Sequence, residues 1–98
     1  MQVTYNHNKM RGIMVSASGI MLGQDRCIDP AHSRELLRKA WAIYKDMKRD
    51  CPSACDEYLG ALAIGEASNP GHPWNRDNAE RYVSQLSLVR FLTRKKGL

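Results

Sequence analysis

The residues of this sequence best suited to chemistry are its cysteines and histidines. Cys27 with His32, and Cys51 with Cys55, supply four side chains of the kinds that bind zinc. Their spacings match no standard zinc finger or knuckle, and Pro52 interrupts the second pair. A helical Cys51/Cys55 pair is more often a packing feature than a metal ligand. We therefore expect no metal and no other cofactor, with a zinc-stapled module as the alternative.

Catalysis has less support than metal binding. His7, His32 and His72 all lie in polar segments, and the sequence contains neither a Gly-x-Ser-x-Gly motif nor a glycine-rich phosphate loop. Asp56 and Glu57 are adjacent, so on a helix their side chains point about 100° apart, which does not suit paired acid–base work. The sequence therefore predicts that the chain is not an enzyme.

Nucleic-acid binding is the more serious alternative function. Four basic residues and one indole follow one stripe of a predicted helix: Arg34, Arg38, Lys45, Arg49 and Trp41. Basic side chains can hold phosphates while an indole stacks on a base. Against this interpretation, Trp41 lies close enough to the apolar face to be core, and no helix-turn-helix spacing follows. This alternative is a small, basic, nonspecific nucleic-acid-binding helical protein.

Three helices are predicted from apolar periodicity, over residues 29–50, 54–67 and 76–96. The first has Asp29 and Pro30 as its start, with Ser33 as a second, later start. Gly60 and Gly65 weaken the second helix, and close approach of another helix is the structural explanation we accept first. Asn75 is the predicted cap of the third helix.

The N-terminal segment, residues 1–28, is predicted to be a short β-hairpin or an extended arm. Apolar triplets at residues 13–15 and 20–22 flank four small residues at 16–19, a pattern that suggests two short strands and a turn. The predicted fold is therefore mainly α, a single domain over residues 1–98. It consists of three helices with an N-terminal hairpin or arm.

Composition limits the class of protein. The chain has 98 residues and a formal net charge of +5, enough for one domain with a modest core. The odd cysteine count, the polar start and an apolar stretch too short to span a bilayer predict a reduced, intracellular, soluble protein without membrane association. Residues 34–50 carry six basic against three acidic residues and residues 76–98 six against two, so both ends of the helical region are basic.

The third predicted helix changes character midway. Its first half has one apolar stripe, whereas Leu88, Phe91 and Leu92 lie on a different side. A helix end that is apolar on two sides is buried by the N-terminal arm or binds a partner. The predicted partner-binding residues are Leu88, Arg90, Phe91, Leu92, Arg94 and Lys95, followed by Arg38 and Trp41.

The strongest helix breaker in the chain is the loop Asn69, Pro70, Gly71, His72, Pro73 and Trp74. Exposed X-Pro bonds followed by an aromatic anchor suit a host prolyl isomerase of the cyclophilin type. The competing interpretation is a rigid connector between helices.

The whole chain resembles the Abc-type anti-RecBCD accessory proteins of lambdoid temperate phages. The resemblance is carried by chain size, basic helical character, the run Tyr58-Leu59-Gly60-Ala61-Leu62 and the proline loop through Trp74. It implies a protein of the host bacterial cytoplasm that binds the host RecBCD helicase–nuclease and inhibits or modifies it. Phage DNA ends would then survive and favour phage recombination. No catalytic residues carry over from this resemblance.

Overall fold

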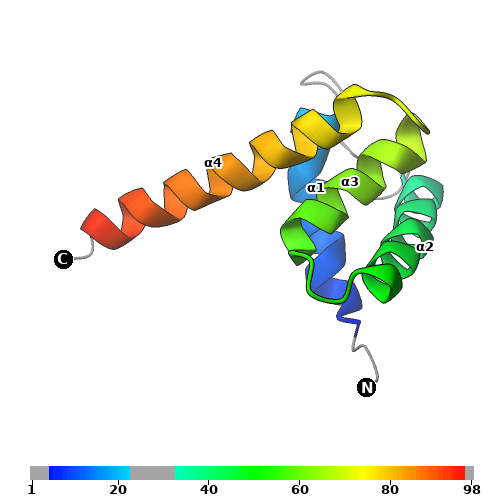
Figure 1. Ribbon diagram of the computed structural model, residues 1–98, viewed down its shortest axis with the longest axis horizontal. Coiled ribbons are helices and arrows are strands. Elements are labelled where there is room, and N and C mark those ends of the chain that lie inside the picture. Colours follow the sequence, from blue (N-terminus) through cyan, green and yellow to red (C-terminus); the bar gives the residue numbers. More distant parts are fainter. Residues whose placement is uncertain (1–4, 23–32, 97–98) are drawn as a thin grey trace.

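The computed structural model describes the backbone of residues 5–22 and 33–96, and the side chains of residues 5–22 and 33–87. These residues form α1 (His7–Leu22), α2 (Arg34–Asp50), α3 (Asp56–Ser68) and α4 (Trp74–Lys96), with no strand in this part of the chain. Helices α1, α2 and α3 pack together, and α4 starts on this body and then extends away from it (Figure 1). The mainly helical prediction is confirmed.

Helix α1 corrects the prediction for the N-terminal segment, because residues 7–22 form neither a hairpin nor an extended arm. Met10, Met14, Ala17 and Met21 are all buried, at spacings of four, three and four residues that place them on one helical face. The small residues at 16–19 belong to the helix instead of a turn. Asn6 helps start it, since its Oδ1 accepts a hydrogen bond from the Lys9 backbone N–H at 3.0 Å.

Helix α3 is the centre of the fold and packs against each of the other described helices. It is apolar nearly all round, as a buried helix must be, and its buried residues are Leu59, Gly60, Ala61, Ala63, Ile64 and Gly65. A Cβ on Gly60 would lie 2.7 Å from Cγ2 of Ile13, and one on Gly65 would lie 2.6 Å from Cε of Met21. The two glycines therefore permit the close approach of α1, as predicted.

Helix α2 packs its apolar face on α3 and α1. Ala40 and Tyr44 are buried, with Leu37 and Met47 half-buried beside them. The structure describes α2 from Arg34, directly after Ser33, which agrees with the later of the two predicted starts. Residues 29 and 30, the other predicted start, lie outside the described residues.

The predicted helices at 54–67 and 76–96 are confirmed as α3 and α4, each end within two residues of its predicted position. Ala79 and Tyr82 in the first half of α4 are buried, and Val83 and Leu86 pack beside them. Asn75 is not the cap that was predicted. It lies inside the first turn of α4, with only 1% of its surface exposed.

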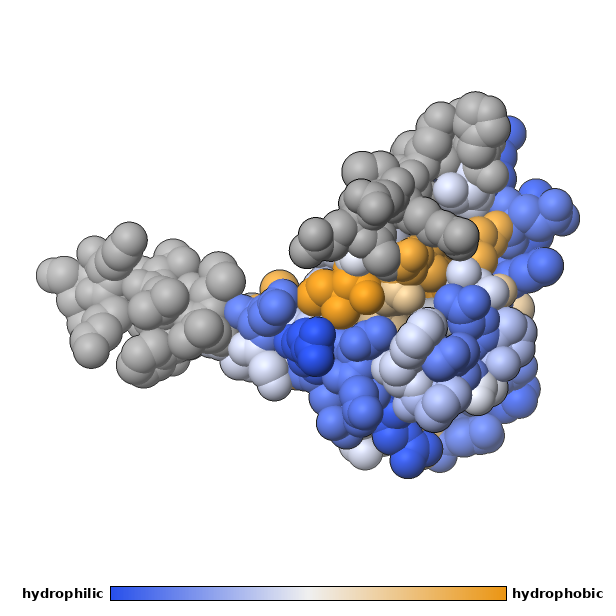
Figure 2. Space-filling view, turned by 90° about the horizontal axis from the view of Figure 1, so that it is seen from above, coloured by the Kyte–Doolittle hydropathy of each residue, from blue (hydrophilic) through white to orange (hydrophobic). Residues whose placement is uncertain are grey.

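On the face seen in Figure 2 the described surface is mostly hydrophilic and is crossed by a strip of apolar residues. Within residues 5–22 and 33–96, none of the helices combines the length and apolar character needed to cross a membrane.

Candidate functional site

A groove of about 260 Å³ lies between α1 and α2, and three arginines line it. Its walls are His7, Arg11 and Met14 from α1 and Arg34, Leu37, Arg38 and Trp41 from α2. On each helix these residues recur every three or four positions, so helical periodicity turns them toward the same side. Met14 is buried, Leu37 and Trp41 are half-buried, and the three arginines are exposed. The groove therefore has an apolar base and a cationic rim.

Aromatic rings form one side of this groove. The Trp41 ring stacks on Tyr44, with centroids 5.5 Å apart, and the His7 ring meets Trp41 edge-on at 4.8 Å. The ring of Tyr5 meets those of Trp41 and Tyr44 edge-on, with centroids 6.1 Å apart in each pair. The Lys45 ammonium lies 5.6 Å from the Trp41 ring centroid, within reach of a cation–π contact. These contacts hold the indole in one orientation.

The charge of the groove is not neutralised by the described part of the chain. None of Arg11, Arg34 and Arg38 forms an ion pair or hydrogen bond with a described side chain. Arg49, farther along α2, differs because it pairs with Asp46 at 3.2 Å. The planar guanidinium group can donate two parallel hydrogen bonds to a carboxylate or a phosphate. The arrangement is therefore suited to holding an anion.

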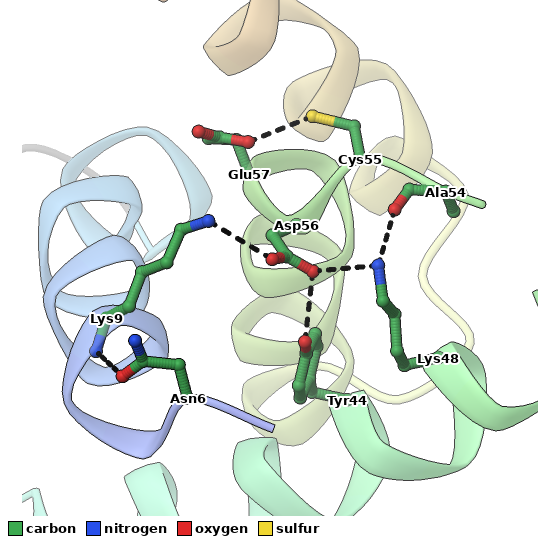
Figure 3. A network of polar contacts seen from close by, with 8 residues as sticks. All are labelled: Asn6, Lys9, Tyr44, Lys48, Ala54, Cys55, Asp56 and Glu57. Atoms are coloured by element: carbon green, nitrogen blue, oxygen red, sulfur yellow. Dashed lines mark hydrogen bonds and ion pairs between the residues drawn. The ribbon is translucent and has the colours of Figure 1, made fainter. Parts of the chain in front are cut away.

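A polar network joins three helices around Asp56, the first residue of α3 (Figure 3). Its Oδ1 accepts a hydrogen bond from the Tyr44 hydroxyl at 3.0 Å and pairs with Lys48 Nζ at 3.0 Å. Its Oδ2 pairs with Lys9 Nζ at 3.3 Å. Lys48 also donates to the Ala54 carbonyl at 2.9 Å. Both carboxylate oxygens of Asp56 have partners, so we interpret this network as one that stabilises the packing of the three helices.

Two pKa values reflect this network. Burial alone would raise the pKa of Asp56, but hydrogen bonds from Lys48, Tyr44 and Lys9 outweigh it and hold the pKa below its usual range. Burial, followed by the hydrogen bond to Asp56 and its negative charge, raises the pKa of Tyr44 well above its usual value. The carboxylate therefore stays charged and the phenol neutral at neutral pH, so this pair is not poised for proton transfer.

The basic stripe predicted on α2 is only partly brought together. Arg34, Arg38 and Trp41 meet in the groove, whereas Lys45 covers the Trp41 ring and Arg49 pairs with Asp46. Sequence reasoning missed His7 and Arg11, because the N-terminal segment was predicted as a hairpin. The signal that could have found them is their spacing with Met14, which is four and then three residues.

The other predicted partner-binding residues lie in the second half of α4. The backbone is helical at all of their positions, and this half of α4 leaves the body (Figure 1). Their side chains lie outside the described residues, so their role stays a prediction. The predicted partner-binding residues in this half of α4 are Leu88, Arg90, Phe91, Leu92, Arg94 and Lys95. Arg38 and Trp41, the other two predicted residues, lie on the separate groove.

The proline loop between α3 and α4 is held firmly yet exposes its prolines. Both Pro70 and Pro73 are exposed, and their peptide bonds are trans. Glu66 holds the loop, because Oε2 accepts the Gly71 N–H at 2.9 Å and Oε1 accepts Asn75 Nδ2 at 3.1 Å. The loop is therefore a braced connector, as one interpretation predicted. Its X-Pro bonds are also accessible, as the prolyl-isomerase interpretation requires.

The tip of this loop is aromatic. The His72 and Trp74 rings stack with centroids 3.6 Å apart. Trp74 keeps 51% of its surface exposed and is the one exposed large apolar side chain among the described residues.

The cysteines do not form a metal centre in the described residues. Cys51 and Cys55 are exposed thiols, and Cys55 Sγ donates to Glu57 Oε2 at 3.1 Å. Cys27 and His32, the other two predicted zinc ligands, lie outside the described residues. Within the described ranges no group of three or more His, Cys, Asp or Glu side chains could hold a metal ion.

Comparison of the chain with protein-family models, with curated proteins and with solved structures found no match. The function of the chain must therefore be inferred from its residues and their geometry.

Proposed function

We propose that this chain is a phage-encoded protein that binds the host RecBCD helicase–nuclease in the bacterial cytoplasm and inhibits or modifies it. Phage DNA ends would then be protected and phage recombination favoured. The sequence resemblance to Abc-type proteins suggests the partner. The structural observation that supports a binding role is the course of α4, which continues as a helix well beyond the packed body (Figure 1).

The first half of α4 explains how such a helix is anchored. Ala79 and Tyr82 are buried against the body, with Leu86 packed beside them. The helix then runs on to Lys96, through a sequence that mixes apolar residues with arginine and lysine. A protruding helix that mixes apolar and basic residues suits a groove in a larger protein, with apolar anchors at the centre and basic residues at the rim. The contact is assigned to Leu88, Arg90, Phe91, Leu92, Arg94 and Lys95. Arg38 and Trp41, the other two predicted partner-binding residues, lie on the separate groove and are not part of this assignment.

The proline loop supports a second host partner, a cyclophilin-type prolyl isomerase. Pro70 and Pro73 are exposed on a loop whose ends are braced by Glu66 and Asn75. The exposed Trp74 ring beside them offers an anchor of the kind found at binding hot spots. The loop lies at the start of α4, whereas the RecBCD contact is assigned to its far half, so the two contacts use separate surfaces.

The test is direct binding of the purified chain to purified RecBCD, measured together with degradation of linear duplex DNA. Phe91→Ala is expected to weaken binding by at least tenfold and to restore degradation, while circular dichroism retains the helical signal. Gln85→Ala is the matched control, because Gln85 is an exposed residue on the same helix. If the unaltered chain neither binds RecBCD nor changes DNA degradation, the proposal is wrong. Equal binding by Phe91→Ala and the unaltered chain would remove the far half of α4 from the contact.

A further inference from the structure

We propose that the groove between α1 and α2 binds single-stranded nucleic acid, with a backbone phosphate held by Arg11, Arg34 and Arg38 and a base placed beside Trp41. This inference goes beyond the RecBCD proposal and does not depend on it. The groove is formed by α1 and α2, whereas the RecBCD contact is assigned to the far half of α4.

The groove carries a positive charge that the described residues leave uncompensated. Three guanidinium groups from two helices converge on one groove, and no described carboxylate pairs with any of them. Like charges gathered in this way create a local positive potential that attracts anions. Arginine binds phosphate through two parallel N–H donors, a geometry that lysine cannot supply. The net charge of +5 acts in the same direction over the whole molecule.

Size and shape favour a chain-like ligand over a free small molecule. The groove volume of about 260 Å³ is below the roughly 300–1,000 Å³ of pockets that enclose drug-sized ligands. A groove of this size holds one phosphate and part of the attached nucleoside while the rest of the strand continues outside. A polymer also gains from Lys45, an exposed basic residue on the same side of α2 as the groove arginines.

The aromatic side of the groove favours nucleic acid over an acidic peptide, and a single strand over a duplex. The rings of His7 from α1 and Trp41 from α2 meet edge-on where they line the groove, and Leu37 contributes apolar surface. Nucleobases gain from contact with aromatic rings in a way that aspartate and glutamate side chains do not. In a duplex the bases are already stacked on one another, so this wall would make no contact with them.

The experiment measures binding of a labelled oligothymidylate of about twelve nucleotides by fluorescence anisotropy at roughly 50 and 200 mM salt. Arg34→Gln and Arg38→Gln are each expected to weaken binding about tenfold and to reduce the salt slope by about 0.7. Trp41→Leu is expected to weaken binding by a similar factor. Arg49→Gln is the matched control on the same helix, because Arg49 lies outside the groove and pairs with Asp46. It should change the affinity less than twofold.

A second readout places the ligand in the groove. In a Trp74→Phe background Trp41 is the one remaining indole, since the chain has two tryptophans. Its fluorescence should be quenched saturably by the unlabelled oligonucleotide, with the same midpoint as the anisotropy titration. Circular dichroism of each variant separates loss of binding from loss of fold.

Three outcomes would overturn the proposal. The first is no binding at the lower salt concentration. The second is a duplex of equal length that binds as tightly as the single strand and is insensitive to Trp41→Leu. The third is polyglutamate that binds more tightly than the oligonucleotide with the same dependence on Arg34 and Arg38, which would make the groove a site for an acidic protein. Phe91→Ala, which tests the RecBCD contact, should leave oligonucleotide affinity unchanged, so the two proposals can fail separately.

Discussion

The Tyr44 hydroxyl donates a hydrogen bond to Asp56 Oδ1 at 3.0 Å, which joins the middle of α2 to the first residue of α3. Because Lys9 of α1 and Lys48 of α2 pair with the same carboxylate, one side chain ties three helices together (Figure 3). Tyr44 also stacks on Trp41, which lines the groove. The network therefore helps set the position of the aromatic wall.

Replacement of Asp56 by asparagine should lower the free energy of unfolding by about 1–3 kcal/mol. The amide removes the negative charge that Lys9 and Lys48 share and replaces one acceptor oxygen with a donor. Urea denaturation at neutral pH measures the change. Asp46→Asn is the control, because Asp46 forms a highly exposed pair with Arg49, and its effect should stay within about 0.5 kcal/mol. Equal changes in unfolding free energy for the two substitutions would show that the Asp56 network stabilises the fold no more than an exposed ion pair does.

The contribution of Asp56 to stability should disappear in acid. Its pKa is lowered in the folded protein, so between the two pKa values the unfolded chain binds more protons and stability rises with pH. The stabilisation is therefore fully present above about pH 4, the unfolded pKa, and is lost as the pH falls below it. The difference in unfolding free energy between the unaltered chain and Asp56→Asn should shrink from neutral pH to about pH 3. A constant difference would contradict the lowered pKa.

Tyr44 should make the opposite contribution in alkali. Because its pKa is raised in the folded protein, the folded chain retains the phenolic proton after the unfolded chain has lost it. Its stabilisation is present below about pH 10 and is lost above that pH. Tyr44→Phe should therefore lose less stability than the unaltered chain between about pH 9 and 11. Parallel losses in urea denaturation across this range would indicate that Tyr44 titrates normally.

Much of the fold follows from local sequence, and α1 shows where this fails. The segments of α2, α3 and α4 are bounded by helix-breaking residues or have a clear apolar face. The sequence pattern therefore predicted these three helices. Helix α1 has small residues between its apolar ones, and Ser18 is buried although it is polar. Its hydroxyl is satisfied within the helix, because it donates to the Val15 carbonyl at 2.6 Å. In the sequence, Ser18 followed by Gly19 is typical of a turn. The spacing of the methionines in the same segment is that of a helix.

Four glycines in helices should respond to alanine in opposite ways. Gly60 and Gly65 face α1 side chains at distances too short for a Cβ, so Gly60→Ala and Gly65→Ala should destabilise the protein by about 1–3 kcal/mol. Gly12 and Gly19 have nothing within 4 Å of an added Cβ, so alanine there should stabilise by about 0.5–1 kcal/mol. Thermal and urea unfolding of the four variants measures both signs. Stabilisation by Gly60→Ala would show that α1 does not pack closely on α3.

The candidate site was predictable only in part, because long-range contacts complete it. The stripe of Arg34, Arg38 and Trp41 is visible in the sequence, but its partners His7 and Arg11 come from a helix that the local pattern did not reveal. Asn75 illustrates the same limit, since its position before a helix predicted a cap. Its amide donates instead to Glu66 Oε1 and to the Asn69 carbonyl. Such uses of a polar side chain depend on which segments fold together.

Removal of residues 88–98 should leave the body of the protein intact. The anchoring residues of α4 are Ala79, Tyr82, Val83 and Leu86, all of which this truncation retains, and the helix beyond them runs away from the body (Figure 1). The unfolding free energy should therefore change by less than about 1 kcal/mol, mainly through fraying of the shortened helix. Urea denaturation tests this, with a deeper truncation before Tyr82 as the control that should unfold the chain. If removal of residues 88–98 destabilised the protein as much as the deeper truncation, the far half of α4 would be part of the core. Its apolar residues would then be unavailable to a partner, and the assignment of the proposed RecBCD contact to this half of α4 would be wrong.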